Sequence, residues 1–143
     1  MTMPWEFLVL TAGLGQLVLV AASLAIPRVL RWPEDVARLR PLTRQVFWTY
    51  AAYIWFTNMA FGLVSTFGRR WLLDGRPLAG AVCAFIATYW GARVVIQFVY
   101  FDRTDAPRGP PYAVAEAALV ALFVFLTLVY AAVSWRTFGG LGV

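Results

Sequence analysis

The segment YAVAEAALVALFVFLTLVYAAVSW, residues 112–135, decides the fold class. It contains one charged side chain, Glu116, and otherwise consists almost entirely of apolar residues. About 20 such residues in a helix cross the hydrocarbon core of a bilayer, which is roughly 30 Å thick. A helix in the core of a water-soluble domain rarely needs this length. The segment therefore predicts a membrane-spanning helix.

The composition of the whole chain agrees with a membrane location. Of its 143 residues, 62% are hydrophobic and 13% are charged, whereas a soluble domain is about half apolar and a quarter charged. Three further apolar segments, residues 5–25, 47–67 and 78–101, are each long enough to cross a bilayer with some tilt. We therefore expect an all-α, integral membrane four-helix bundle, in which residues 1–143 form a single four-span membrane domain.

The loop after the first expected span carries the signals of a short helix. Residues 33–40 (PEDVARLR) place a proline and two acids in the first turn and arginines at the end. The apolar residues Trp32, Val36 and Leu39 are expected to face lipid, while the arginines reach lipid phosphates. We therefore predict a short interfacial helix that ends before Pro41. A regulatory docking site is the alternative reading of this segment.

The arginine distribution predicts an orientation in the membrane. All twelve basic residues are arginines, which favours a bacterial, GC-rich genome. The loops after the first and third spans hold seven arginines, whereas the N-terminus, the second loop and the C-terminal tail hold four. Because cytoplasmic loops are enriched in basic residues, we expect a bacterial cytoplasmic (inner) membrane protein with both termini outside. No basic residue precedes the first span, so we expect no cleaved signal peptide.

The residue counts exclude several kinds of chemistry. The chain has no histidine and one cysteine, Cys83, so the usual ligands of zinc, haem and iron–sulfur clusters are missing. A histidine general base is missing for the same reason. We therefore expect no catalytic residue, no metal site and no cofactor, and Cys83 is expected to act as a small apolar side chain. The positive charge is spread over several loops, so we expect no nucleic-acid partner.

Arg93 is the most informative polar residue, because it lies well inside an expected span. An arginine there costs about 2.5–3.5 kcal/mol on insertion scales and normally faces a partner. Glu116 on the antiparallel fourth span lies at a similar depth, so we predict an Arg93–Glu116 ion pair. The spacing of Trp90, Gln97 and Tyr100 places them on the same helix face as Arg93.

Other polar residues extend this predicted cluster. The second span contributes Tyr53 and Asn58, and the first span contributes Gln16. Together with the stripe around Arg93 these residues form a predicted polar cluster. Hydrogen bonding between helices, a lipid head-group or quinone pocket, and solute translocation are three alternative roles for it.

These features favour a non-catalytic small accessory or scaffold subunit of a larger bacterial membrane protein complex. The loops are too short to form a soluble domain, and the aromatic side chains around every span cannot all be buried in one four-helix bundle. The expected partners are other membrane protein subunits, in a homo- or hetero-oligomer, and membrane lipids. The alternative is a lipid-, quinone- or solute-binding carrier that uses an inward-facing polar pocket.

Overall fold

The computed structural model describes residues 3–140, and this part of the chain is helical without any strand. It forms four long helices and three short ones, two of the short helices lying between the first and second long helices and one between the second and third. The long helices are α1 (Met3–Ser23), α4 (Pro41–Phe67), α6 (Pro77–Val99) and α7 (Pro110–Gly139), and the short helices are α2 (Ile26–Val29), α3 (Trp32–Ala37) and α5 (Arg69–Leu72).

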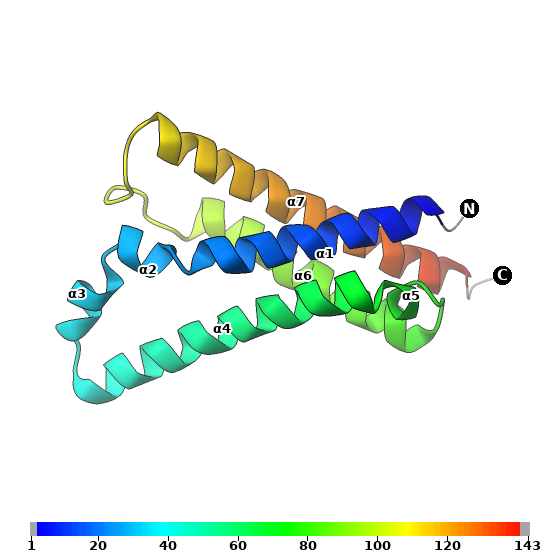
Figure 1. Cartoon of the computed structure of the whole chain (residues 1–143), viewed down its shortest axis with the longest axis horizontal. Coiled ribbons are helices and arrows are strands. Elements are labelled where there is room, and N and C mark those ends of the chain that lie inside the picture. The colour runs from blue at the N-terminus through cyan, green and yellow to red at the C-terminus, as the bar shows by residue number, and fades with distance from the viewer. Residues whose placement is uncertain (1–2, 141–143) are drawn as a thin grey trace.

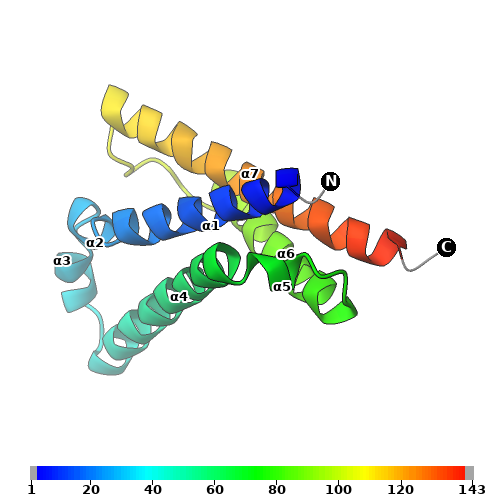
Figure 2. The same ribbon diagram turned by 45° about the vertical axis from the view of Figure 1, so that its right-hand side comes forward.

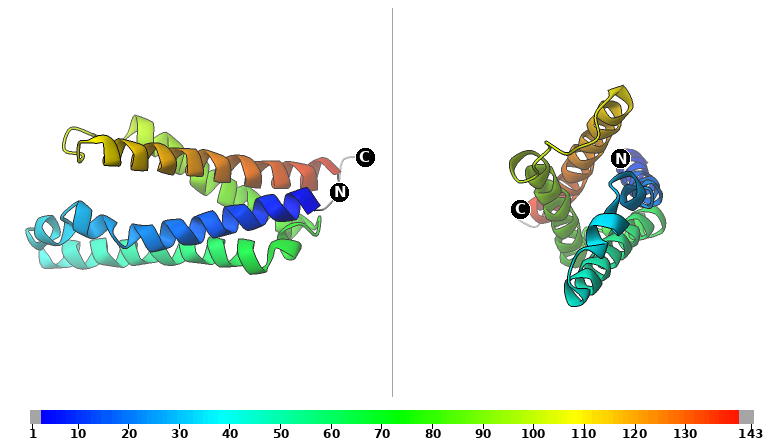
Figure 3. Two further views of the ribbon diagram at one scale, coloured as in Figure 1. Left: turned by 45° about the horizontal axis from the view of Figure 1, so that its top comes forward. Right: turned by 90° about the vertical axis from the view of Figure 1, so that its left-hand side faces the viewer.

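The long helices form two antiparallel hairpins, α1 with α4 and α6 with α7 (Figure 1). Both chain ends and α5 lie at one end of the molecule, here called the termini end. The segments α2 and α3 and the α6–α7 connection lie at the opposite end, here called the loop end (Figure 1). The hairpins meet near the termini end and diverge toward the loop end, as Figures 2 and 3 show from two further directions.

Three helices are long and apolar enough to cross a membrane: Pro4–Ser23, Pro77–Val99 and Pro110–Gly139. The structure thus confirms an all-α fold with three candidate membrane-spanning helices. The four-helix membrane bundle is not confirmed, because α4 does not reach the same apolarity. Its tyrosines, tryptophans and threonines, together with Asn58, dilute the aliphatic residues along its length.

Prolines set where three of the long helices begin. Pro41, Pro77 and Pro110 each occupy the first turn of a helix. A backbone N–H group in the first turn has no acceptor within the helix, so a proline at this place costs no hydrogen bond. Helix α4 consequently starts six residues before the expected span 47–67, and α7 starts two residues before 112–135. The first and third expected spans end slightly too late, since α1 stops at Ser23 and α6 at Val99.

The first loop contains the predicted short helix as α3, preceded by the additional turn α2. The expectation that Val36 faces lipid is wrong, because its side chain is only 5% exposed. Trp32 is half-buried and packs edge-on against Phe47 at the start of α4, with 5.2 Å between ring centroids. The helix α3 therefore folds back onto the protein through this face.

Close packing within each hairpin depends on small residues. A Cβ atom on Gly13 of α1 would lie 2.8 Å from the Thr66 backbone nitrogen of α4, and one on Gly80 of α6 would lie 2.8 Å from Thr137 Cγ2 of α7. At these distances, any side chain at Gly13 or Gly80 would force the partner helix to shift. Cys83 is fully buried in the apolar core between the hairpins.

Candidate functional site

A buried hydrogen-bond network joins all four long helices. Its centre is the side chain of Gln16 on α1, which is 0% exposed. Gln16 Nε2 donates to Tyr130 Oη on α7 at 2.7 Å, and Gln16 Oε1 accepts from Trp90 Nε1 on α6 at 3.0 Å. Tyr130 Oη also lies 2.5 Å from Ser65 Oγ on α4. One side chain from each long helix thus meets at a single point.

The polar atoms of this network satisfy one another. The Gln16 amide nitrogen also donates to the Ala12 carbonyl oxygen at 3.3 Å. The Trp90 ring stacks on Phe123 of α7, with 5.3 Å between centroids. A buried polar atom that loses its partner costs about 1–3 kcal/mol, so the network resists separation of the hairpins. It therefore acts as a structural clamp between helices.

The predicted polar cluster is divided among different places in the structure. Trp90 belongs to the Gln16 network, on a part of α6 that packs against α1 and α7. Tyr53 is 64% exposed and Tyr100 is 81% exposed, so the expectation that they line an inward-facing pocket is wrong. Tyr53 lies on the face of α4 away from α1, and Tyr100 follows the last residue of α6.

Glu116 forms an ion pair, but with a different arginine from the predicted one. Its Oε1 atom lies 2.5 Å from Arg103 Nη2 and accepts a hydrogen bond from Gln97 Nε2 at 3.2 Å. Gln97 and Glu116, two members of the predicted polar cluster, are thus in contact, whereas the predicted Arg93–Glu116 ion pair is wrong. Because α7 begins at Pro110, Glu116 lies in its second turn, within reach of the loop that carries Arg103.

Arg93 is half-buried and contacts two aromatic rings. Its guanidinium carbon lies 5.0 Å from the Phe101 ring centroid and 5.5 Å from that of Phe123. Phe101 follows the end of α6, so the long Arg93 side chain extends toward the loop end. Attraction between the cation and the ring faces replaces the predicted carboxylate. This extension also brings the charge nearer to the membrane border.

Asn58 and Arg93 both lie near Tyr89, a residue that was not part of the predicted polar cluster. The Tyr89 side chain on α6 lies beside both the Asn58 side chain and the Arg93 guanidinium. Its ring contacts Phe61 of α4 edge-on, with 5.2 Å between centroids. Within residues 3–140, the buried Asn58 Oδ1 has no hydrogen-bond partner. Tyr89 precedes Arg93 by four residues, so its position on the same helix face is the signal that could have revealed it.

Ser65 and Tyr130 were also missed as members of the central network. Ser65 lies near the end of α4, and a tyrosine such as Tyr130 is equally common at a membrane border, so neither residue type by itself indicates a buried network. The useful signal was Gln16, a strong hydrogen-bonding side chain in the middle of α1 that requires partners from other helices.

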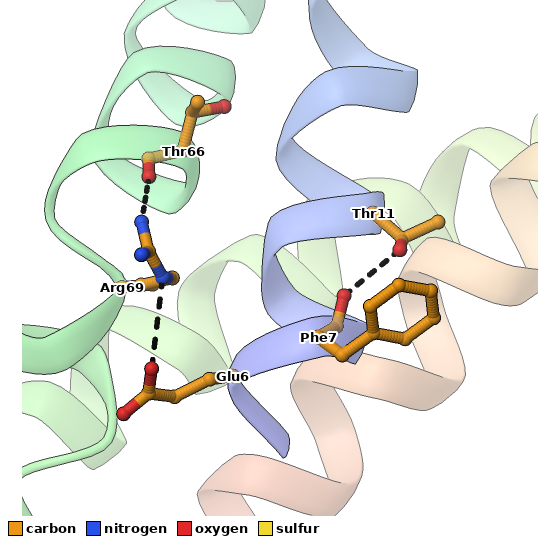
Figure 4. Close-up of polar contacts among 5 residues, drawn as sticks. All are labelled: Glu6, Phe7, Thr11, Thr66 and Arg69. Carbon is orange, nitrogen blue, oxygen red and sulfur yellow. Dashed lines mark hydrogen bonds and ion pairs between the residues drawn. The ribbon is translucent and has the colours of Figure 1, made fainter. Parts of the chain in front are cut away.

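Arg69 connects α1 with α4 at the termini end (Figure 4). Its Nη1 atom donates to the Thr66 carbonyl oxygen at 2.9 Å, and its Nε atom lies 3.8 Å from Glu6 Oε2. The Thr66 carbonyl is one of the last of α4 and lacks a partner within the helix. On α1, Thr11 Oγ1 donates to the Phe7 carbonyl oxygen at 2.8 Å (Figure 4).

The described part of the chain contains no group of three or more histidine, cysteine, aspartate or glutamate residues that could hold a metal ion. No protein-family model matches the chain, and no curated protein sequence and no solved structure matches it.

Proposed function

We propose that the chain is a non-catalytic accessory or scaffold subunit of a larger complex in the bacterial inner membrane, and that it binds other membrane proteins through α4. The observation that carries this proposal is the outward face of α4, the face away from α1. This face presents large apolar and aromatic side chains, here called the α4 stripe: Leu42, Val46, Tyr53, Phe56, Leu63, Val64 and Phe67.

In this proposal α4 crosses the membrane as a fourth span. It has 27 residues, which at 1.5 Å per residue is a length of about 40 Å. It runs antiparallel to α1 along that helix (Figure 3). Trp55 Nε1 donates to the Val20 carbonyl oxygen at 3.1 Å, and Gly62 packs closely against Leu17. These contacts support an α4 that lies at the same depth as α1.

The polar atoms on the exposed side of α4 favour a protein neighbour over lipid. The hydroxyl-bearing side chains of Tyr50 and Tyr53 are both mainly exposed and lie near the middle of the helix. A hydroxyl group in hydrocarbon has no hydrogen-bond partner, which costs several kcal/mol in a fully apolar medium. A neighbouring membrane helix can supply both apolar contact and a hydrogen bond.

The exposed side of α7 provides a contrast within the same molecule. Its middle section exposes the aliphatic side chains Val124 and Leu128, without a polar atom. Such a surface suits lipid tails. The difference between α4 and α7 gives the proposal a matched control.

Site-specific photocrosslinking in native membranes tests this proposal. A photoreactive phenylalanine analogue at Tyr53 or Phe56 should crosslink the 16.0 kDa chain to another polypeptide, whereas the analogue at Val124 or Leu128 should give much less. A product with twice the chain mass would identify a second copy as the partner. Equal crosslinking from α4 and α7, or none from α4, would contradict the proposal.

A lipid-, quinone- or solute-binding carrier is the second candidate, and the surroundings of Arg93 favour it. Within the described residues Arg93 has no carboxylate partner, and Asn58, whose Oδ1 atom is unpaired there, also lies beside Tyr89. A guanidinium group and an amide near an aromatic ring suit a phosphate or a quinone carbonyl. Binding of a water-soluble quinone analogue by the purified chain, lost in Arg93→Gln, would favour this candidate if α4 gives no crosslinks.

A further inference from the structure

A small cavity lies at the termini end, between α1, α5 and α7. Its volume is about 130 Å³, and it is lined by Trp5, Glu6, Arg70, Leu73 and Arg136. The sequence reading assigned no role to these side chains together. They come from α1, from α5 and the residue that follows it, and from α7, which are far apart in the sequence, so only the tertiary structure brings them to one place.

The cavity presents charges of both signs. Arg70 and Arg136 contribute two guanidinium groups, and Glu6 contributes a carboxylate. Within residues 3–140, Glu6 accepts no hydrogen bond, since its contact with Arg69 is 3.8 Å long (Figure 4). Arg70 forms no ion pair with the described carboxylates. A ligand with one anionic and one cationic group would complement this lining, whereas a ligand with a single sign of charge would meet repulsion from one side.

The surrounding side chains indicate the level of lipid head groups. Trp71 and Trp135, which follow and precede the lining residues Arg70 and Arg136 in the sequence, are exposed, and Trp5 lines the cavity. Tryptophan concentrates where the hydrocarbon core meets the head groups, because its ring is apolar and its N–H group seeks a polar partner. Arginines at this level bind phosphate with paired hydrogen bonds.

We propose that this cavity binds a phosphoethanolamine group, with the phosphate on Arg70 and Arg136 and the ammonium on Glu6. A primary ammonium donates hydrogen bonds to a carboxylate, which a trimethylammonium group cannot do. Quaternary ammonium groups are instead bound by open aromatic faces. In this cavity the Trp5 ring is already covered by the Arg136 guanidinium, 4.5 Å from the ring centroid. The geometry therefore selects ethanolamine over choline.

Native mass spectrometry of the full chain in detergent tests this site. Equal amounts of dioleoyl phosphatidylethanolamine, phosphatidylcholine and phosphatidylglycerol are added, and the lipid adducts are counted. Adducts with phosphatidylethanolamine should exceed each of the others by about fivefold, the effect of one charged contact at a partly exposed site. Equal binding of phosphatidylethanolamine and phosphatidylcholine would overturn the proposal.

Substitutions test which residue binds the ammonium group of the ligand and which binds its phosphate. Glu6→Gln should reduce phosphatidylethanolamine to the level of phosphatidylcholine, because the ammonium loses its acceptor. Arg70→Gln should reduce all phospholipid adducts, and it stays informative if Glu6→Gln fails to fold, since Arg70 has no ion pair within the described residues. Arg76→Gln is the matched control, because this arginine is exposed at the same end and does not line the cavity. Unchanged preference in Glu6→Gln would overturn the assignment.

A competition experiment distinguishes the membrane phospholipid from free phosphoethanolamine as the ligand. Free O-phosphoethanolamine at millimolar concentration should displace the lipid if the head group alone is the ligand. Retention of the lipid identifies the membrane lipid as the ligand, because its acyl chains then contribute to binding along the apolar helices.

Discussion

Gln16 Nε2 lies 2.7 Å from Tyr130 Oη, although 114 positions separate the two residues in the chain. This bond joins the first hairpin to the second, since Gln16 belongs to α1 and Tyr130 to α7. The same hydroxyl reaches Ser65 on α4, and the same amide accepts from Trp90 on α6. Two side chains therefore hold the hairpins together in a core that is otherwise mainly apolar.

Tyr130→Phe should destabilise the folded chain by about 1–3 kcal/mol. The substitution keeps the ring but removes the hydroxyl, which leaves one Gln16 amide proton and the Ser65 hydroxyl without their partner. The free energy of unfolding in mixed micelles measures this effect. Tyr53→Phe is the control, because its hydroxyl is exposed and should contribute less than 0.5 kcal/mol. Equal effects of the two substitutions would mean that the network contributes nothing.

A double-mutant cycle should couple Glu116 to Arg103 and not to Arg93. Their contact is half-exposed, so the coupling energy between Arg103→Ala and Glu116→Ala should be about 0.5–1 kcal/mol. The matched cycle between Arg93→Ala and Glu116→Ala should be additive within error. A larger coupling in the Arg93 cycle would restore the pair that the sequence predicted.

Gly13→Ala should weaken the α1–α4 hairpin by about 1–3 kcal/mol. The added Cβ atom would lie 2.8 Å from the Thr66 nitrogen and 2.9 Å from the Ser65 carbonyl carbon, which are backbone atoms that cannot move aside independently. Gly91→Ala is the matched control, since its Cβ atom would make an ordinary contact of 3.4 Å with Thr127 Cγ2. A comparison of thermal unfolding midpoints in one detergent decides between them, and similar midpoints would refute the close approach.

Cysteine labelling tests the proposed orientation. In a Cys83→Ala background, an impermeant thiol reagent applied to intact spheroplasts should label Gly140→Cys at the termini end. It should spare Ala37→Cys at the loop end, because the arginine-rich loops are proposed to face the cytoplasm. Both positions are exposed, so burial does not confound the comparison. The reverse labelling pattern would place the termini inside.

Parts of the site followed from local sequence, and parts did not. The proximity of Gln97 to Glu116 was predictable, because two antiparallel helices joined by a short loop bring such positions to the same depth. The partner of Glu116 was not, because Arg103 lies in a loop whose path no periodicity describes. The predicted positions of Tyr53 and Val36 were also wrong. The hydroxyl group of Tyr53 does not determine which face of the helix is buried, and the apolar side chain of Val36 can contact lipid as well as protein.

The sequence by itself determined that the chain is helical and apolar enough to cross a membrane, because long uninterrupted apolar segments have few other stable states. The prolines at the helix starts and the short loops also favoured antiparallel hairpins. Only the tertiary structure decided which polar atoms meet: Gln16 with Tyr130, Glu116 with Arg103, and Glu6 beside Arg70 and Arg136. In an apolar interior each polar atom requires a partner, yet which partner it finds depends on the rotation and crossing of whole helices, which the sum of many small packing contacts fixes.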